Sequence, residues 1–345
     1  MMPQPVRNAD MRRANPRTSS APRRRLALIL GGGALALGLA LASLLAPQRE
    51  TQAAESQTKV ILNGEAVAVH FNDGDSFRVL TGDFKDTKAR LFGYNTLESY
   101  GPVHQWGSWT AHELYVIAKM GTYNARDGVW ECETDGATDT YGRILVWCPK
   151  LAESQIRGGY AHVMSIDDNP GKPELIAAQR EAVTKRRGIW AHGVPDFVLT
   201  SLHSKEEDVD GKGTYNRLVS SVDGHSVKWR HNTRYAECDR VCQYRYSVDG
   251  AVIDELLPVA KSDAEIGAFL RPLSDADARS VLYDFAEYRH INRKIPEDQR
   301  KALDALLNEW AKAGKFGAQQ RSEGSCMIHA PFKRRFGGGK AECLK

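Results

Sequence analysis

An uncharged stretch of 21 residues, Leu26–Ala46, directly follows three consecutive arginines at positions 23–25. A basic flank before a long apolar run is typical of a secretory signal peptide or an N-terminal membrane anchor. The length is ambiguous, because a spanning helix needs about 20 apolar residues and a signal core is usually shorter, about 7–15. We therefore expect a basic tail over 1–25, a signal peptide or anchor over 26–46, and a polar linker over 47–58.

All six cysteines follow this stretch, so both interpretations place them outside the cytoplasm. The expected location is secreted or periplasmic, with membrane contact only through residues 26–46 if they are retained. An even number of cysteines in an exported protein predicts disulfides. A metal site is the alternative, but Cys238-x3-Cys242 does not have the usual zinc spacing. The sequence leaves the pairing of the last four cysteines open; a short Cys238–Cys242 bridge and a Cys326–Cys343 bridge are two possibilities.

The net charge of +4 comes from 47 basic and 43 acidic residues, and it is unevenly distributed. The first 54 residues hold eight arginines against Asp10 and Glu50, which is +6, so residues 55–345 carry −2. The whole-chain charge is therefore no sign of a nucleic-acid-binding surface. A hydrophobic content of 42% with 26% charged residues indicates a globular protein and excludes collagen-like, mostly disordered and multi-span membrane chains.

Residues 59–192 contain short β-prone runs separated by Asn-Gly, Asp-Gly and Thr-Gly turns. The expected strands lie near 60–62, 66–69, 77–80, 89–92, 129–133 and 143–148. Helical patterns lie near 109–120, 151–157 and 173–187, where Gly188 ends the last helix. This segment is predicted to be a β-rich α+β domain.

Residues 193–345 are predicted to be a separate α+β accessory domain. Strand-like runs lie near 215–221 and 226–230. Ser274 begins a capping box ahead of an apolar helical stripe. Pro296 fits the first position of a second amphipathic helix. No family is recognised for this part of the chain.

Four motifs in the first domain carry charged and polar groups that belong together. They are Asp73-Gly74-Asp75-Ser76, Arg90 with Asn95-Thr96-Leu97-Glu98, Asp139-Thr140-Tyr141-Gly142-Arg143, and Gly188-Ile189-Trp190. Each motif alone is a weak signal. Their order and spacing together resemble the staphylococcal nuclease (thermonuclease) family over residues 59–192.

This resemblance implies an OB-fold five-stranded barrel with three helices and Ca²⁺-dependent cleavage of DNA and RNA, with single strands preferred. By motif position, the calcium ligands would be Asp75, Asn95 and the Thr96 carbonyl, with Asp73 behind them. The catalytic residues would be Arg90, Glu98 and Arg143, and Tyr141 would contact the substrate phosphate. The resemblance also implies that Cys132 and Cys148 face each other on neighbouring strands and form a disulfide.

The residue types suit this reaction. Guanidinium groups bind two phosphate oxygens at once and stabilise the charge that builds up during attack. Calcium prefers oxygen ligands and tolerates irregular geometry, so a carboxylate, an amide oxygen and a carbonyl can hold it together with water. A carboxylate beside a metal-bound water is a suitable general base.

Several positions depart from the family pattern, among them Leu97, which replaces a proline, and Thr140, which replaces a lysine. Asn95 stands where the family has an acidic ligand, so the site has one negative charge fewer. Ser165 stands where a second substrate-contacting tyrosine is expected. His104 lies in a segment without a gap-free match; it either faces the site or lies in a solvent-exposed loop. These departures keep open an alternative function, a catalytically weakened scaffold that binds nucleic acid or envelope material without cutting it.

The segment Lys228–Tyr246 interleaves five basic residues with four aromatic residues. Such a pattern forms a stacking and phosphate-binding surface for single strands in some proteins. The alternative is a pair of amphipathic strands with a structural role. The sequence favours the structural interpretation, and no protein partner follows from it.

Overall fold

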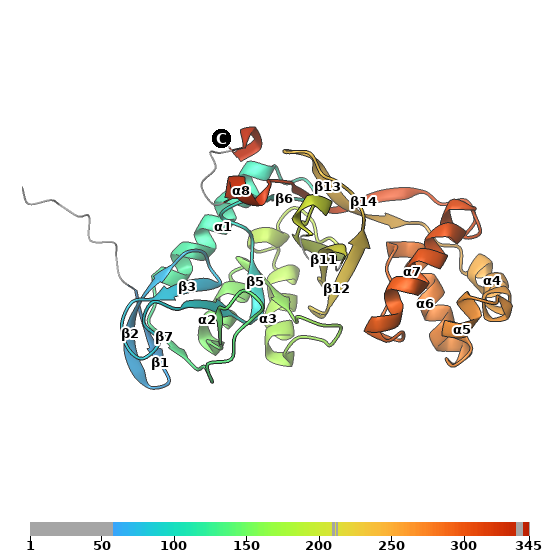
Figure 1. Ribbon diagram of the computed structural model, residues 1–345. Helices are drawn as coiled ribbons and strands as arrows, with labels where there is room; N and C mark the ends of the chain where they lie inside the picture. Colours follow the sequence, from blue (N-terminus) through green and yellow to red (C-terminus); the bar gives the residue numbers. More distant parts are fainter. Residues whose placement is uncertain (1–57, 209–210, 212, 336–340, 345) are drawn as a thin grey trace, which may run out of the picture. The chain divides into compact units, whose positions relative to one another are not determined.

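The computed structural model describes residues 58–208, 211, 213–335 and 341–344 (Figure 1). The predicted tail and apolar segment, and the linker up to residue 57, lie outside the described residues. All described residues belong to one compact unit. None of the helices in this part of the chain is long and apolar enough to cross a membrane.

Strands and α-helices both occur along the whole described chain. The strands are β1 (Thr58–Leu62), β2 (Glu65–Phe71), β3 (Ser76–Val79), β4 (Lys88–Leu91), β5 (Gly93–Thr96), β6 (Val103–Gln105), β7 (Trp130–Cys132), β8 (Ile144–Val146), β9 (Ala161–Met164), β10 (Phe197–Ser201), β11 (Thr214–Ser220), β12 (Ser226–His231), β13 (Arg240–Tyr246) and β14 (Arg321–Ile328). The α-helices are α1 (Ala111–Arg126), α2 (Pro149–Arg157), α3 (Pro173–Thr184), α4 (Gly250–Ser262), α5 (Ile266–Leu270), α6 (Asp275–Tyr288), α7 (Glu297–Lys312) and α8 (Phe332–Arg335).

A six-stranded sheet in the order β7-β1-β2-β3-β4-β8 forms the first part of the fold. Its two edge strands meet again through a pair of 2.8 Å backbone hydrogen bonds between Glu133 and Trp147. The sheet therefore curls around a core of aliphatic and aromatic side chains. This confirms a mixed α+β fold with a curled sheet. The sheet has six strands, whereas the resemblance implied a barrel of five.

A tight hairpin joins β1 to β2. Asn63 and Gly64 both have positive φ, 52° and 87°, and Leu62 pairs with Glu65 across the turn. Two-residue turns with φ > 0 at both positions match the natural twist of paired strands, and Asn-Gly is the preferred sequence there. The turn therefore folds β1 back along β2 as a separate strand.

Helices α1 to α3 belong to the same segment, in the predicted order. Helix α1 begins with a capping box, in which Thr110 and Glu113 satisfy each other's backbone N–H groups. In α2, the buried Gln155 side chain donates hydrogen bonds to the carbonyls of Gly74 and Gly121. This amide joins α2 to α1 and to the turn that carries the candidate site.

Two small sheets follow the curled sheet along the chain. Strands β10, β11 and β12 form one antiparallel sheet, and β13, β14 and β6 form the other. Figure 1 shows β13 and β14 side by side. Because β6 precedes residue 192 and β14 follows it, strand pairing crosses the predicted boundary between residues 59–192 and 193–345. The division into two domains stays a prediction.

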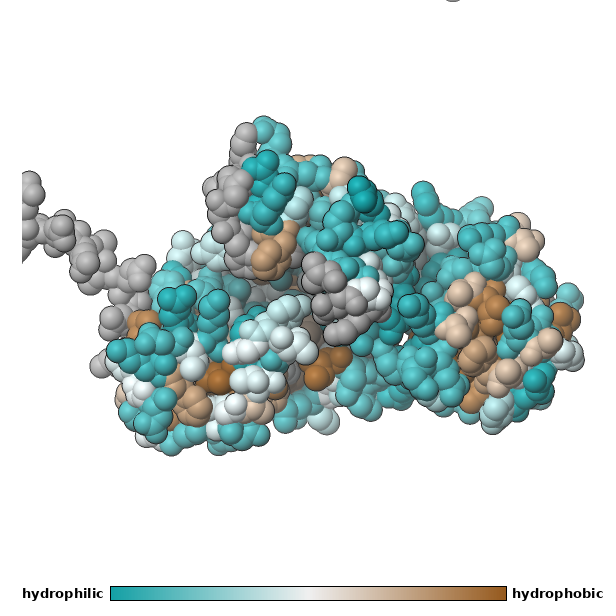
Figure 2. All heavy atoms as spheres, viewed as in Figure 1, coloured by the Kyte–Doolittle hydropathy of each residue, from teal (hydrophilic) through white to brown (hydrophobic). Residues whose placement is uncertain are grey.

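Helices α4 to α7 pack around their own core, which includes Leu282, Phe285 and Leu307. Ser274 caps α6 as predicted, since its side chain accepts a hydrogen bond from the Asp277 N–H. Pro296 lies one position before α7 begins, so the expected helix starts one residue later than predicted. Figure 2 shows hydrophobic residues gathered on the surface over α4 and α5, whereas hydrophilic residues cover most of the rest of this face.

The six cysteines form three disulfides. Cys132–Cys148 joins the end of β7 to the residue that precedes α2, and this is the pairing that the resemblance implied. The other two bridges are Cys238–Cys343 and Cys242–Cys326, so the possible Cys238–Cys242 and Cys326–Cys343 pairings are wrong. The reason is strand register, because Cys242 on β13 lies directly opposite Cys326 on β14. Three disulfides indicate an oxidising, extracellular environment.

Candidate active site

The turn between β2 and β3 places two carboxylates next to each other. The Asp73 carboxylate accepts hydrogen bonds from the Ser76 hydroxyl at 2.6 Å and the Asp75 N–H at 3.2 Å, which stabilises the turn. A Cβ atom on Gly74 would lie 2.5 Å from the Thr96 methyl group. Only glycine fits here, because the turn packs directly against β5.

Asp75 is the buried carboxylate of this turn, with 3% of its surface exposed. Its Oδ2 accepts hydrogen bonds from the Thr96 N–H at 2.7 Å and the Thr96 hydroxyl at 3.0 Å. Its Oδ1 lies 2.5 Å from Nη1 of Arg90. The protein around Asp73 desolvates it, and together with the charge of Asp75 this raises the pKa of Asp73 above its ordinary value.

Arg90 lies on β4 between Ala89 and Leu91, which are both buried in the core of the curled sheet. Side chains alternate along a strand, so the Arg90 guanidinium lies on the other face of the sheet. Desolvation by itself lowers the pKa of Arg90. The carboxylates around it outweigh this effect and raise the pKa above its ordinary value; they are Asp75, Asp73 and Glu98.

Asn95 completes the group from β5. Its Oδ1 accepts a 2.6 Å hydrogen bond from Nη2 of Arg90, so one guanidinium bridges Asn95 and Asp75. Its Nδ2 donates a 2.7 Å hydrogen bond to the Thr96 carbonyl. All three predicted calcium ligands therefore lie together, and each already has a hydrogen-bond partner from the protein.

The donor set suits a hard cation. Asp75 Oδ1 and Asn95 Oδ1 converge on a single positive group, and both are oxygen atoms of the kind that calcium prefers. In this arrangement the positive group is the Arg90 guanidinium. For these oxygens to bind calcium at its usual 2.3–2.6 Å, Arg90 has to turn away from them.

Arg143 and Tyr141 lie on the loop between β7 and β8. Arg143 contacts Asp139 through Nε and Nη2, both at 2.7 Å, and its guanidinium carbon lies 5.4 Å from the centre of the Tyr141 ring. Tyr141 is 73% exposed. Within the described residues, no hydrogen bond or ion pair joins Arg143 or Tyr141 to Asp75 or Arg90. The structure therefore brings Asp73, Asp75, Arg90, Asn95, Thr96 and Glu98 into one neighbourhood and leaves this pair on a separate loop.

Two buried histidines beside this group were not predicted as buried. His162 on β9 pairs with Asn95 in the strand register, and its Nε2 lies 3.4 Å from Asn95 Nδ2. Burial lowers the pKa of His162 to about 4. His104 on β6 is 1% exposed, and burial, followed by the effect of His162, lowers its pKa to about 3.

The prediction of a solvent-exposed loop for His104 is therefore wrong. The residue lies on a strand that pairs with β14, more than 200 positions further along the chain. Sequence patterns around His104 do not reveal this pairing, because three residues are too few to show alternation. The polar His162 within an apolar strand was a signal that could have been used.

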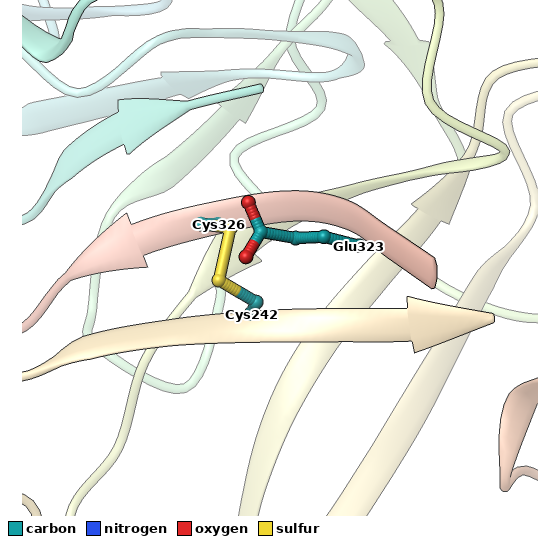
Figure 3. A group of neighbouring side chains, drawn as sticks. All are labelled: Cys242, Glu323 and Cys326. Atoms are coloured by element: carbon teal, nitrogen blue, oxygen red, sulfur yellow. A yellow bond between two sulfur atoms is a disulfide. The ribbon is translucent and has the colours of Figure 1, made fainter. Parts of the chain in front are cut away.

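Cys242, Glu323 and Cys326 form the cluster within the described residues whose atoms are close enough to suggest a metal site (Figure 3). Figure 3 shows the bond between the two sulfur atoms, and Glu323 forms an ion pair with Arg240. A disulfide leaves no thiolate to bind a metal. This cluster is structural.

The segment Lys228–Tyr246 proves to be two strands with neutralised charges. Trp229 and Tyr235 pack against the core formed by β10 to β14. Each of its five lysines and arginines has an acidic partner; the pairs are Lys228–Glu297, Arg230–Glu297, Arg234–Glu206, Arg240–Glu323 and Arg245–Glu287. These contacts favour the structural interpretation of the segment.

Comparison with known proteins identifies part of the chain. The family model described as Staphylococcal nuclease homologue matches residues 88–192. No match was found among curated proteins. The matched residues contain Arg90, Asn95, Thr96, Glu98 and Arg143, whereas the turn with Asp75 precedes them. The resemblance seen in the motifs is therefore confirmed over residues 88–192, which are similar to the staphylococcal nuclease homologue family.

Proposed function

We propose that residues 59–192 form a Ca²⁺-dependent nuclease domain that hydrolyses phosphodiester bonds of DNA and RNA with little sequence specificity. We further propose that its curled sheet is the OB-type barrel of that family. The observation that carries the proposal is the convergence of Asp75 and Asn95 on Arg90, beside Glu98. Arg90, Asn95 and Glu98 lie inside the matched family segment.

Asp75, Asn95 and the Thr96 carbonyl would hold the calcium ion. When bound there, calcium would supply positive charge to a phosphate oxygen and lower the pKa of a water molecule. Asp73 holds the turn that presents Asp75. Arg90, displaced from its two oxygen partners, is then available to bind the phosphate.

Glu98 would accept the proton of the attacking water as its oxygen bonds to phosphorus. The bond from phosphorus to the 5′ oxygen would break, and the leaving oxygen would take up a proton from water to become a 5′ hydroxyl, which leaves a 3′-phosphate end. Arg90 and Arg143 would stabilise the negative charge on the phosphate oxygens, and Tyr141 would contact the same phosphate. For this, Arg143 has to exchange its contact with Asp139 for the substrate.

The test is cleavage of single-stranded DNA and RNA by the purified chain with its disulfides intact, in calcium and then in chelator. We expect cleavage that depends on calcium and is lost in Glu98→Ala/Arg143→Ala. The matched control is Glu174→Ala/Arg180→Ala, which removes the same two charge types from exposed positions on α3. Absence of calcium-stimulated cleavage, or full activity of the first variant, contradicts the proposal.

The second candidate is the weakened scaffold that binds without cutting. The specific observation in its favour is the Asn95 side chain, which replaces a carboxylate and donates to the Thr96 carbonyl that should hold the metal. The same assay separates the two functions, because a scaffold would retain DNA or RNA in chelator and in calcium alike and would release no product.

We propose that the protein is exported through residues 26–46, as a cleaved signal or a retained anchor. The three disulfides support an oxidising location. The mass of the native N-terminus distinguishes the two forms, since cleavage removes the apolar segment. A cytoplasmic protein that starts at Met1 contradicts export.

A further inference from the structure

A cleft of about 530 Å³ lies between the loop that follows β9, the strands β11 and β12, and the start of α7. Four of its lining residues are basic: Arg217, Lys228, Arg293 and Arg300. Three are acidic: Asp167, Asp168 and Glu297. This local excess of positive charge is notable because residues 55–345 as a whole carry −2.

The strand register explains why basic groups gather here. Arg217 on β11 pairs with Lys228 on β12, and Tyr215 pairs with Arg230 two positions further along. Residues opposite each other on neighbouring strands share a face, and so do residues two apart. The intervening Thr214, Asn216 and Leu218 are buried on the other face. The sheet therefore presents three cations and one tyrosine on the face that borders the cleft.

The acidic residues of the cleft are already engaged. Asp168 forms an ion pair with Arg300, and Glu297 lies 3.0 Å from the Lys228 ammonium group. Asp167 accepts hydrogen bonds within its own loop, from the Ser165 hydroxyl and the Asn169 N–H. These contacts neutralise Lys228 and Arg300 in place.

Arg217 and Arg293 differ from these two. Neither forms an ion pair with a carboxylate of the described residues, and each donates through Nη1 to a carbonyl of the same loop. Arg217 contacts the Ile166 carbonyl at 2.9 Å, and Arg293 contacts the Asp168 carbonyl at 3.2 Å. Two guanidiniums are thus held by carbonyls two residues apart on one loop, and neither forms an ion pair with a carboxylate in the described part of the chain.

The cleft is joined to the candidate active site by β9. His162 on this strand pairs with Asn95, and the cleft begins four residues later at Ile166. At about 3.3 Å per residue, this separation is roughly 13 Å. Backbone hydrogen bonds of 2.7 Å, from Ser165 N–H to Gly224 and from Ser226 N–H to Asp167, fasten the loop to the sheet of β11 and β12.

We propose that this cleft binds the phosphodiester backbone of a nucleic-acid strand outside the scissile bond, with Arg217 and Arg293 as the phosphate contacts. The proposal rests on the proposed nuclease function. Guanidiniums match phosphate oxygens in pairs. The shared strand places the cleft within a few nucleotides of the cutting site, which favours nucleic acid over an acidic peptide.

Binding is measured with the full chain and a labelled single-stranded oligothymidylate, in chelator so that no cleavage takes place, over a range of salt concentrations. Each phosphate contact to a single strand contributes about 0.7 to the slope of log affinity against log salt. We expect Arg217→Ala/Arg293→Ala to reduce this slope by about 1.4 and to weaken binding about tenfold. Arg293→Ala alone, at an exposed position, should reduce the slope by about 0.7 even if the double variant fails to fold.

The matched control is Arg180→Ala/Arg271→Ala, which removes two exposed arginines elsewhere and should leave the slope unchanged. An equal loss of slope in this control overturns the proposal, and so does an unchanged slope in the cleft variants. If polyglutamate at the same concentration of negative charge displaces the oligonucleotide, the cleft binds acidic peptides and the nucleic-acid proposal is overturned. The cleavage assay in calcium tests the nuclease function separately. If the cleft variants lower the salt slope but the unaltered chain never cleaves nucleic acid, the cleft proposal stands and the proposed nuclease function is contradicted.

Discussion

Arg90 is the residue on which the candidate site depends most. Its guanidinium contacts Asp75 and Asn95 at 2.5 and 2.6 Å, so it holds the oxygens that a calcium ion would need. A cation and a guanidinium compete for these atoms. Because Asn95 is neutral, the proposed calcium site would have a single carboxylate ligand with which to attract the metal.

Replacing Asn95 with Asp should tighten calcium binding. A second carboxylate adds a negative charge to the ligand set, and the number of charged ligands is one of the factors that set calcium affinity. We expect the dissociation constant from isothermal titration calorimetry to fall about tenfold, equivalent to about 1.4 kcal/mol.

The control for this change is Asn232→Asp, which adds the same charge at an exposed position between β12 and β13. It should leave calcium affinity unchanged. If Asn95→Asp also leaves it unchanged, residue 95 is not a calcium ligand.

At the scale of elements, the contact between β7 and β8 decides the shape of the first sheet. The two strands lie at opposite edges in the strand order, and each pairs in parallel with its neighbour, β1 or β4. The Glu133–Trp147 hydrogen bonds and the Cys132–Cys148 disulfide bring these edges together. Closing the edges also removes unpaired strand groups from the surface.

Removing this disulfide with Cys132→Ala/Cys148→Ala should lower the free energy of unfolding by about 3 kcal/mol, since the bridge closes a loop of 16 residues and so limits the unfolded chain. Urea unfolding followed by tryptophan fluorescence measures the difference. A change below about 0.5 kcal/mol would mean that the backbone pairing holds the edges without the bridge.

At the scale of the whole molecule, buried histidines link stability to pH. His104 and His290 are 1% and 5% exposed, and burial lowers the pKa of each to about 3. In the unfolded chain both titrate near 6.5. Between these values the unfolded state binds more protons, so acid favours unfolding.

We therefore expect the free energy of unfolding to be fully retained above about pH 6.5 and to fall as the pH drops towards 4, by up to about 1.4 kcal/mol per pH unit for each histidine. Urea unfolding at several pH values measures this slope. His290→Phe keeps an aromatic ring beside Phe197. It should reduce the pH slope of the free energy of unfolding by the contribution of one histidine. The exposed His112→Asn should leave it unchanged, and an unchanged slope in His290→Phe contradicts the prediction.

Local signals in the sequence predicted local features well. The Asn-Gly turn after β1, the Ser274 cap and the apolar stripe of α7 depend on residues within a few positions of one another. The Cys132–Cys148 bridge was also expected, because the family resemblance relates its two strands. Helix and strand identities follow from such short-range patterns, since dihedral preferences and side-chain periodicity act locally.

Contacts between distant segments were not predictable in the same way. The burial of His104, the Cys242–Cys326 pairing and the carboxylate partners of Lys228–Tyr246 all depend on strand register or on helices far along the chain. The cleft at Arg217 and Arg293 arises in the same manner, from residues more than 70 positions apart.

The sequence by itself determined the motifs, the local elements and the resemblance of residues 88–192 to a known family, because motif spacing is a property of the chain. Only the tertiary structure decided that Arg90 occupies the oxygens of the expected metal ligands, and that two arginines in a chain body of charge −2 remain without carboxylate partners among the described residues. The physical reason is that electrostatic interactions depend on distance in space, and folding sets that distance independently of separation along the sequence.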